Sequence, residues 1–299
     1  FVVVLGDILH CHEKINTQPF CRAVKFLSDL ADERETFALI GNHDRINNNV
    51  FLTEEHPFVG LKEYPNLHII DTTLYFSSSS LQKRKEKEES LFAFVPYVPN
   101  GRFKEALEIE KEKKEEKEKK EEKEKKEEKE KKEALEIEKE EKENKRNYEE
   151  CTAIFAHQEF RGCKMGAIIS EDGDIWEEEL PTVFSGHIHD HQRPQKNIFY
   201  PGIPFQHGFA DNDDKAIYLL SIGSPFQKGE WETEKIELEI TPKKLYTMTL
   251  EQFESFQPPE NAIIKINFQC HESTMKKMIS SKKFREKIKR HNIDYKLKV

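Results

Sequence analysis

The sequence predicts an α/β fold whose strands end in polar residues. Three observations predict it: the chain opens on a β-branched run, "FVVVL", an amphipathic segment follows, and a second apolar run, "TFALI", comes next. Strand, helix and strand in this order form the repeating unit of a parallel sheet. With 299 residues the chain has room for one large domain or two modest ones.

The first helix is expected over residues 19–32, after a proline that suits a first helical turn. Apolar residues recur there at intervals of three and four: Phe20, Val24, Leu27 and Leu30. Further strands are expected within the stretches 67–77, 90–98, 152–158, 182–189, 196–209 and 215–222. Two of them, "TAIFAHQ" and "TVFSGHIH", contain histidine at their C-terminal ends. These strands complete a domain that we expect to cover residues 1–223.

A small α+β domain is expected over residues 224–299. Its predicted elements are strands in "KIELEITP", "AIIKINFQC" and "DYKLKV", a helix from Thr249 through Phe256 and a basic helix near 273–290. From His271 to Val299 there are ten Lys or Arg against three acidic residues, a local charge of +7 in a chain of net charge −9. Such a segment can bind a polyanion, or it can be an ordinary solvated helix face.

A low-complexity insertion interrupts the first domain at about residues 104–147. Residues 111–133 repeat KEKKEE and carry no apolar stripe, so the segment is expected to be a solvated helix or disordered. It is either a charged arm for a partner or a tolerated expansion of a surface loop.

Cysteine usage and hydropathy favour an intracellular protein, in the cytoplasm or the nucleus. The five cysteines include no CxxC pair and suggest no disulfide framework. No apolar run approaches the roughly 18 residues of a membrane span, so no membrane contact is expected. Because the chain begins with Phe1 inside a predicted strand, we expect residues to be missing upstream.

Polar residues at the predicted strand ends form a mixed oxygen and nitrogen set, which suits Mn²⁺, Fe²⁺ or Zn²⁺. They are Asp7 with His10 and His12, Asn42 with His43 and Asp44, His157, and His187 with His189. In "GHIH", strand alternation predicts that both histidines point to the same side, and the preceding glycine allows a close approach of the backbone.

Each of these residues taken singly has an ordinary structural alternative. His157 could be a buried core histidine whose hydrogen bonds are all made, and Asp44 could cap a turn and have no other role. His12, His191 and His207 are expected to be loop residues without a role in the site.

The order of the motifs resembles the calcineurin-like metallophosphoesterase superfamily. "GDILH" (6–10) is followed by "GNHD" (41–44), a strand ending in His157 and "GHIH" (186–189). The form GDxxH, together with "VPYVPNGRF" and "FAHQEFRG", is similar to the SbcD-like double-strand-break-repair nucleases, which occur in cells, phages and large DNA viruses. The resemblance implies a four-layer α/β/β/α sandwich followed by a small capping-like unit.

The resemblance also implies two divalent ions, most often Mn²⁺, with Fe²⁺ or Zn²⁺ as alternatives. Asp7 would bridge the two ions. Asn42, His157 and His187 would hold one ion, and His189 would help hold the other.

Three further residues receive roles from the same resemblance. His43 would give its proton to the leaving oxygen, Asp44 would orient the His43 ring, and His10 would contact the substrate phosphate. The implied reaction is hydrolysis of DNA phosphodiester bonds by a two-metal mechanism, as an exonuclease or endonuclease.

The sequence departs from the superfamily at one point. A motif of the form Asp-x-His should precede GDxxH, and only six residues precede Asp7. Either the chain is truncated or it has lost one ion, and we expect the chain as numbered to show little or no turnover.

Two other functions remain open at this point. The chain could be another metallophosphoesterase, a phosphatase or a cyclic nucleotide phosphodiesterase, or a metal-poor scaffold that binds a protein without catalysis. For the nuclease, the resemblance implies DNA and a coiled-coil ATPase of the SMC type as partners. A homodimer and a viral origin are left open.

Overall fold

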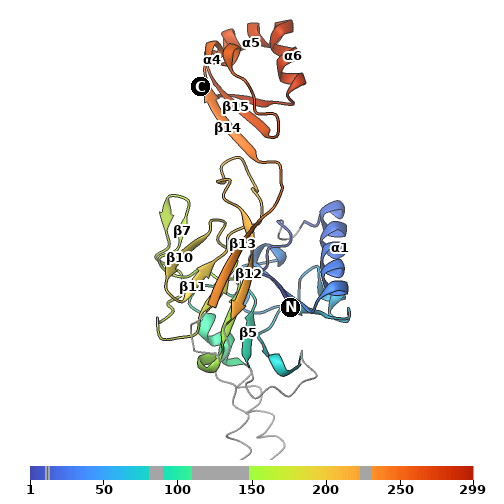
Figure 1. Cartoon of the computed structure of the whole chain (residues 1–299), viewed down its shortest axis with the longest axis vertical. Coiled ribbons are helices and arrows are strands. Elements are labelled where there is room, and N and C mark those ends of the chain that lie inside the picture. The colour runs from blue at the N-terminus through green and yellow to red at the C-terminus, as the bar shows by residue number, and fades with distance from the viewer. Residues whose placement is uncertain (11, 13, 81–89, 110–147, 223–230, 299) are drawn as a thin grey trace, which may run out of the picture. The chain divides into compact units, whose positions relative to one another are not determined.

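The computed structural model describes residues 1–10, 12, 14–80, 90–109, 148–222 and 231–298 (Figure 1). The chain separates into two compact units, Phe1–Gly202 with Leu220–Thr233, and Ile203–Leu219 with Glu234–Val299. The second unit thus includes residues 203–219, which the sequence analysis assigns to the first domain. The expected boundary at 223/224 and residues 110–147 of the Lys/Glu insertion lie outside the described residues.

Two sheets form the first unit in the described part of the chain. The smaller one is parallel, with the strand order β1-β2-β3. The larger one has the order β10-β11-β9-β6-β5-β4, and its strands are parallel except for β4 and β10 at the edges. The bounds are β1 (Val2–Val4), β2 (Thr36–Leu39), β3 (Leu67–Ile70), β4 (Leu74–Ser77), β5 (Leu91–Val95), β6 (Ala153–Ala156), β9 (Val183–Ser185), β10 (Gln192–Gln195) and β11 (Ile198–Tyr200).

Phenylalanine rings fill the space between these two sheets. The Phe37 ring in β2 stacks on Phe94 in β5 with 4.1 Å between ring centroids, and Phe94 stacks on Phe155 in β6 at 5.2 Å. Because side chains alternate along a strand, the neighbours of these residues face outward. Ala38 packs with Leu27 of helix α1 (Thr17–Glu33), which covers the outer face of the small sheet.

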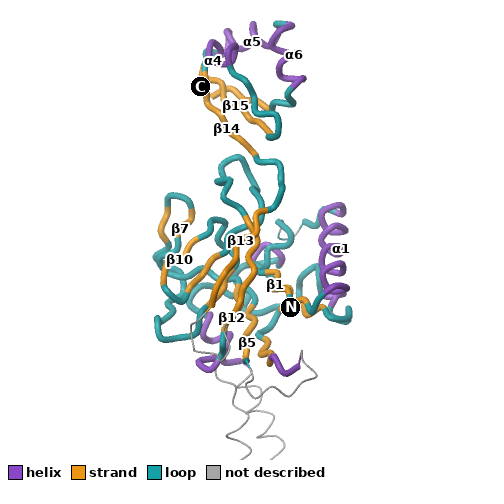
Figure 2. The backbone as a smooth tube through the Cα atoms, viewed as in Figure 1, coloured by secondary structure: helices purple, strands orange, loops and turns teal. Residues whose placement is uncertain are grey.

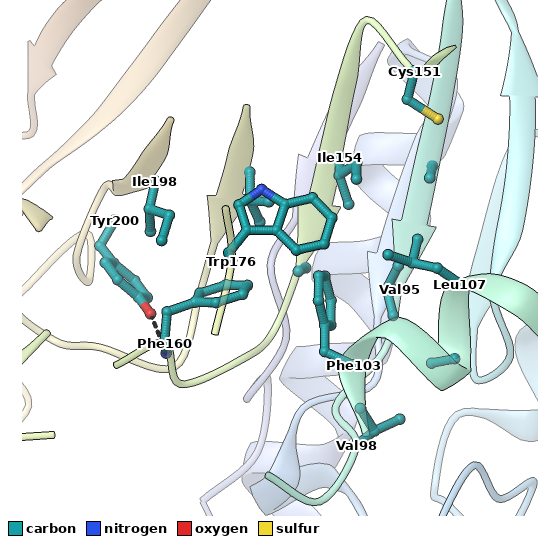
Figure 3. Close-up of a cluster of buried hydrophobic side chains, with 14 of the residues drawn as sticks. Val95, Val98, Phe103, Leu107, Cys151, Ile154, Phe160, Trp176, Ile198 and Tyr200 are labelled. Atoms are coloured by element: carbon teal, nitrogen blue, oxygen red, sulfur yellow. Dashed lines mark hydrogen bonds between the residues drawn. The ribbon is translucent and has the colours of Figure 1, made fainter. Parts of the chain in front are cut away.

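A second helical segment, residues 103–109, covers the outer face of the large sheet. Figure 3 shows Phe103 and Leu107 from this segment packed with Val95, Ile154 and Trp176. Helix, sheet, sheet and helix are the four layers that the sequence analysis predicts, and the fold is therefore an α/β/β/α sandwich. The expected helix at 19–32 is confirmed as α1.

Short elements connect the layers. They are the 3₁₀ helices η1 (Asn42–Asp44), η2 (Val59–Leu61), η3 (Ser78–Ser80) and η4 (Tyr148–Glu150), the hairpin of β7 (Lys164–Met165) and β8 (Ile168–Ile169), and the pair β12 (Ala216–Ile222) and β13 (Trp231–Glu237).

The second unit contains a parallel sheet with helices on one face (Figure 2). Its strands are β14 (Lys243–Met248), β15 (Ile263–Gln269) and β16 (Asp294–Lys298), and its helices are α4 (Leu250–Ser255), α5 (Glu272–Ser280) and α6 (Lys282–Arg290). The core joins Phe253, Phe268 and Phe284. The prediction of one basic helix over 273–290 is wrong, because Ser281 has an extended backbone (φ −68°, ψ 130°) that ends α5 and precedes α6.

Nothing in the described part of the chain resembles a membrane span, since no helix there combines sufficient length with sufficient hydropathy.

Candidate metal centre

Four polar side chains from the two sheets converge at one edge of the sandwich. Asp7 follows β1 and Asn42 follows β2 in the small sheet, whereas His157 follows β6 and His187 follows β9 in the large sheet. Asp7, His157 and His187 offer ligand atoms within 4.8 Å of one another. The Asn42 Oδ1 atom lies 3.1 Å from Nε2 of His157 and 2.9 Å from Nδ1 of His187. We call these four residues the metal group.

Two of these side chains belong to residues with an unusual backbone conformation. Asp7 has φ 54° and His187 has φ 75°, in the left-handed region that non-glycine residues seldom adopt. The expected strand alternation in "GHIH" is therefore wrong: β9 ends at Ser185, Ile188 is buried, and His189 is exposed.

Close approach of the backbone explains the glycines in this region. A Cβ atom at Gly41 would lie 2.2 Å from Oδ1 of Asp7, and one at Gly186 would lie 2.2 Å from the Leu5 carbonyl oxygen. Both positions therefore require glycine if the metal group is to keep its geometry.

The hydrogen bonds of His157 indicate that the group requires a cation. Nδ1 of His157 lies 2.5 Å from the Leu5 carbonyl oxygen, which can only accept, so Nδ1 carries the proton. In the neutral ring Nε2 then has a lone pair, which faces Oδ1 of Asn42 at 3.1 Å and Oδ1 of Asp7 at 3.3 Å. Three converging lone pairs repel one another unless a proton or a metal ion lies among them. The residues therefore fit a divalent ion with two oxygen and two nitrogen donors.

The electrostatics of Asp7 and His157 agree with this conclusion. Burial acts to raise the pKa of Asp7, but His157 and the N–H of His43 lower it, and the net pKa lies below the usual range. Burial acts to lower the pKa of His157, but Asp7 and the Leu5 carbonyl raise it, and the net pKa is raised. The pKa of His187 is lowered to about 3, first by burial and then by His157.

His43 lies beside the metal group and between two other imidazoles. Its backbone N–H donates to Oδ1 of Asp7 at 2.9 Å. The His10 ring stacks on it with 5.0 Å between centroids, and the His12 ring lies at 4.7 Å. Burial, above all, lowers the pKa of His43. His12, expected to be a loop residue without a role, thus contacts the proposed catalytic histidine.

The carboxylate of Asp44 accepts hydrogen bonds from three backbone N–H groups. Asp44 is 1% exposed, and its partners are the N–H groups of Leu9 at 2.8 Å, Gly41 at 3.0 Å and Ile8 at 3.2 Å. Nδ1 of His43 is buried and has no hydrogen-bond partner in the described part of the chain, so the orientation of that ring by Asp44 stays a prediction. The hydrogen bonds of Asp44 tie the "GDILH" loop to the "GNHD" turn. Burial, with the nearby Asp7 charge, raises its pKa to about 7.

Several predicted site residues lie outside the metal group. His189 is exposed, and no second group of converging ligands occurs in the described residues, so its role as a ligand of a second ion stays a prediction. His10 is exposed but reaches His43.

Two residues near the group were not singled out from the sequence. Tyr97 follows β5, and its ring centroid is 6.0 Å from that of His187. Glu159 follows β6, and its Oε2 atom is 3.9 Å from Nε2 of His187. Both stand in the quoted stretches "VPYVPNGRF" and "FAHQEFRG", Tyr97 near the end of a predicted strand and Glu159 directly after one, and these positions were the signal that could have found them.

Comparison with known proteins adds independent information. Residues 1–191 match the family described as "Calcineurin-like phosphoesterase". The chain is 39% identical over 268 residues to "Putative phosphoesterase 244L" of Invertebrate iridescent virus 6, an alignment that covers 88% of this chain and 79% of that relative. It is 36% identical over 251 residues to "Putative phosphoesterase 078R" of Invertebrate iridescent virus 3, covering 84% of this chain and 59% of that relative. The chain thus spans less than two thirds of the second relative.

Proposed function

Because the chain belongs to the calcineurin-like phosphoesterase family, whose members are metal-dependent hydrolases, we propose that it hydrolyses phosphodiester bonds of DNA. The proposed activity is that of an exonuclease or endonuclease in repair or recombination, with Mn²⁺ as the favoured ion. The observation that carries the proposal is the placement of His43 directly beside the metal group, with the His10 ring stacked on the His43 ring.

The metal group would hold one divalent ion through Asp7, Asn42, His157 and His187. Bound divalent ions would supply positive charge that polarises the phosphodiester and makes an attacking water more acidic. His189 is proposed as a ligand of a second ion.

His43 is proposed to donate the proton to the leaving oxygen. Its Nδ1 atom is buried without a partner, and a buried N–H without an acceptor is costly, so the proton of the neutral ring is favoured on Nε2. The metal-free environment lowers the pKa of His43, mainly through burial. A phosphate beside the ring would raise that pKa again, so substrate binding would itself promote the protonated form that donates.

The basic face of α6 supports DNA as the substrate. Lys282, Lys283, Arg285, Lys289 and Arg290 are exposed along this helix. Neutralisation of phosphates by Lys and Arg drives binding that does not depend on sequence. We propose that residues 224–299 form the capping-like domain that holds DNA, without assigning it a position relative to the metal group.

A nuclease assay tests the proposal. It uses the protein expressed from its whole reading frame, so that any residues before Phe1 are included. With Mn²⁺ and end-labelled duplex DNA, we expect degradation that His43→Ala slows by about 10²–10⁴-fold, the usual contribution of a general acid. His191→Ala is the matched control, because His191 is an exposed imidazole outside the metal group, and it should cleave like the wild type. Equal rates for the wild type and His43→Ala would contradict the role of His43.

Small substrates distinguish DNA cleavage from the other phosphoesterase activities. Bis(p-nitrophenyl) phosphate is a phosphodiester, and p-nitrophenyl phosphate is a monoester. A protein that cleaves the monoester faster and leaves DNA intact would be a phosphatase, and the nuclease proposal would be abandoned.

The viral relatives support a viral origin of the protein. We propose that the protein is virus-encoded and acts inside the host cell, in the cytoplasm or the nucleus. A coiled-coil ATPase of the SMC type and a second copy of the chain are proposed as partners on the basis of the resemblance alone.

A further inference from the structure

The two nitrogens of the His187 ring face different surroundings. Nδ1 lies 2.9 Å from Oδ1 of Asn42, on the side of the metal group, whereas Nε2 lies 3.9 Å from Oε2 of Glu159. A neutral imidazole carries one proton, and the nitrogen that binds a metal must be the other one. His187 can therefore serve the metal group only if its proton stays on Nε2.

Glu159 is held in place from its far side. Its Oε1 atom accepts a hydrogen bond from the Ser170 hydroxyl, which in turn accepts the backbone N–H of Gly173 at 3.1 Å. The Glu159 backbone carbonyl also accepts the N–H of Asp174 at 2.9 Å. The turn at 170–174 thus fixes both ends of this residue, and Oε2 is the oxygen that remains toward His187.

The surroundings leave Glu159 one basic neighbour. In the described part of the chain, His187 is the basic group within ion-pair distance of its carboxylate. Glu159 and His187 are both largely buried, with side chains 15% and 18% exposed. The 3.9 Å separation exceeds a hydrogen bond, but such contacts are often long in proteins without ligand and shorten when the ligand binds.

We infer that Glu159 is the positioning residue of His187: its carboxylate accepts the Nε2 proton and so leaves the Nδ1 lone pair for the metal ion. The other imidazole of the group has an equivalent arrangement, because the Leu5 carbonyl accepts the Nδ1 proton of His157 and leaves Nε2 for the ion. Each histidine is then oriented by one oxygen, and such outer contacts commonly fix the tautomer of a metal-binding histidine. The inference deepens the proposed function and rests on it for the presence of a divalent ion.

The first test measures the tautomer of His187 in the metal-free protein. Long-range ¹⁵N–¹H correlation spectra report which ring nitrogen carries the proton, and the His187 signals are those lost in His187→Gln. Because Oδ1 of Asn42 can accept a proton from Nδ1 at 2.9 Å, the two tautomers compete in the metal-free protein. We expect more of the Nε2–H form in the wild type and in Glu159→Gln, whose amide oxygen still accepts, and a shift toward the Nδ1–H form in Glu159→Ala. Glu171→Gln, an exposed residue of the same turn, is the matched control. An unchanged tautomer in Glu159→Ala would overturn the inference.

The second test measures Mn²⁺ affinity by calorimetry. Glu159→Ala should bind Mn²⁺ about 10–100-fold more weakly, Glu159→Gln should lie between it and the wild type, and Glu171→Gln should be unchanged. Thermal unfolding of the same proteins without metal separates this effect from a loss of folding. Wild-type affinity in Glu159→Ala would also overturn the inference.

The outcomes separate this inference from the proposed function. If Mn²⁺ binds with the expected order of affinities but DNA stays intact, the nuclease proposal fails and the role of Glu159 stands. If the wild type binds no Mn²⁺, the metal centre fails, and the tautomer measurement still decides whether Glu159 orients His187.

Discussion

Nε2 of His157 lies 3.3 Å from Oδ1 of Asp7, although the other nitrogen of that ring already donates to the Leu5 carbonyl. The net pKa of Asp7 is lowered and that of His157 is raised. At a pH below the raised pKa of His157, the two residues form an ion pair without metal, and the proton on Nε2 lies where a metal ion would bind.

This competition predicts that Mn²⁺ affinity falls with pH. Below the raised pKa of His157, binding must displace the proton, so affinity should drop by up to about tenfold per pH unit. Calorimetry in two buffers of different ionisation enthalpy measures both the affinity and the protons released. Proton release should rise as pH falls, and an affinity that stays constant as the pH falls below 6.5, the ordinary pKa of histidine, would contradict the proton–metal competition.

Gly41→Ala should disrupt the metal group. The added Cβ would meet Oδ1 of Asp7 at 2.2 Å, and Asp7 must then shift. We expect much weaker Mn²⁺ binding together with a loss of about 1–3 kcal/mol in the free energy of unfolding. Gly60→Ala is the control, because a Cβ there meets nothing within 4 Å. Calorimetry and urea denaturation measure both quantities, and similar behaviour of the two variants would argue against the crowding at Gly41.

Asp44→Asn should change how stability depends on pH. The pKa of Asp44 is raised from 3.8 to about 7, so between these values the folded protein keeps a proton that the unfolded chain has released. The unfolded state binds fewer protons there, and the free energy of unfolding should fall as pH rises through this window. Asp44→Asn lacks this proton and should show a flatter profile in urea denaturation with a chelator present. If the free energy of unfolding of Asp44→Asn falls with pH as steeply as that of the wild type, another titrating group causes the pH dependence.

Asp44→Ala should destabilise the protein strongly. It leaves the N–H groups of Ile8, Leu9 and Gly41 without their acceptor, and each buried orphan costs about 1–3 kcal/mol. We expect a loss of at least about 3 kcal/mol in urea denaturation near neutral pH, where the wild type is the reference. A loss below about 1 kcal/mol would show that water replaces the carboxylate.

Substitutions of Lys287 and Lys283 should change different properties, stability for Lys287 and DNA binding for Lys283, although both residues belong to α6. The Lys287 ammonium donates to the carbonyls of Phe253 at 2.6 Å and Glu254 at 3.2 Å, so Lys287→Met should cost about 1–2 kcal/mol of stability. Lys283 is exposed, so Lys283→Met should weaken DNA binding and lower the salt slope by about 1. Urea denaturation and DNA binding at several salt concentrations measure the two effects. Equal loss of DNA affinity in both variants would contradict this division.

The assembly of the metal group could be predicted because strand order places the residues. Asp7, Asn42, His157 and His187 each follow a buried strand, and the carboxyl ends of parallel strands share one edge. The helix α1 followed from apolar periodicity, whereas the four layers followed from the resemblance that the order of the motifs carries.

Other features depend on contacts that no local pattern encodes. The left-handed backbone at His187 ends the strand alternation that "GHIH" predicts, and it directly follows Gly186, whose backbone lies close to the Leu5 carbonyl. Asp44 resembles a partner for His43 in sequence, yet its carboxylate is taken by N–H groups about 35 residues away along the chain. The break at Ser281 could not be predicted because the basic, helix-forming composition continues on both sides of it.

The origin of the four donors in two different sheets has a consequence for folding. Asn42 and His187 are separated by 145 residues in sequence and belong to opposite layers of the sandwich. A bound ion would act as a cross-link between these layers, closing a long loop in the way that a disulfide does elsewhere. Its contribution would grow with free metal concentration, and a chelator would remove this cross-link while the Phe37–Phe94 stack still holds the layers together. The same ion would then take part in the reaction and also stabilise the fold.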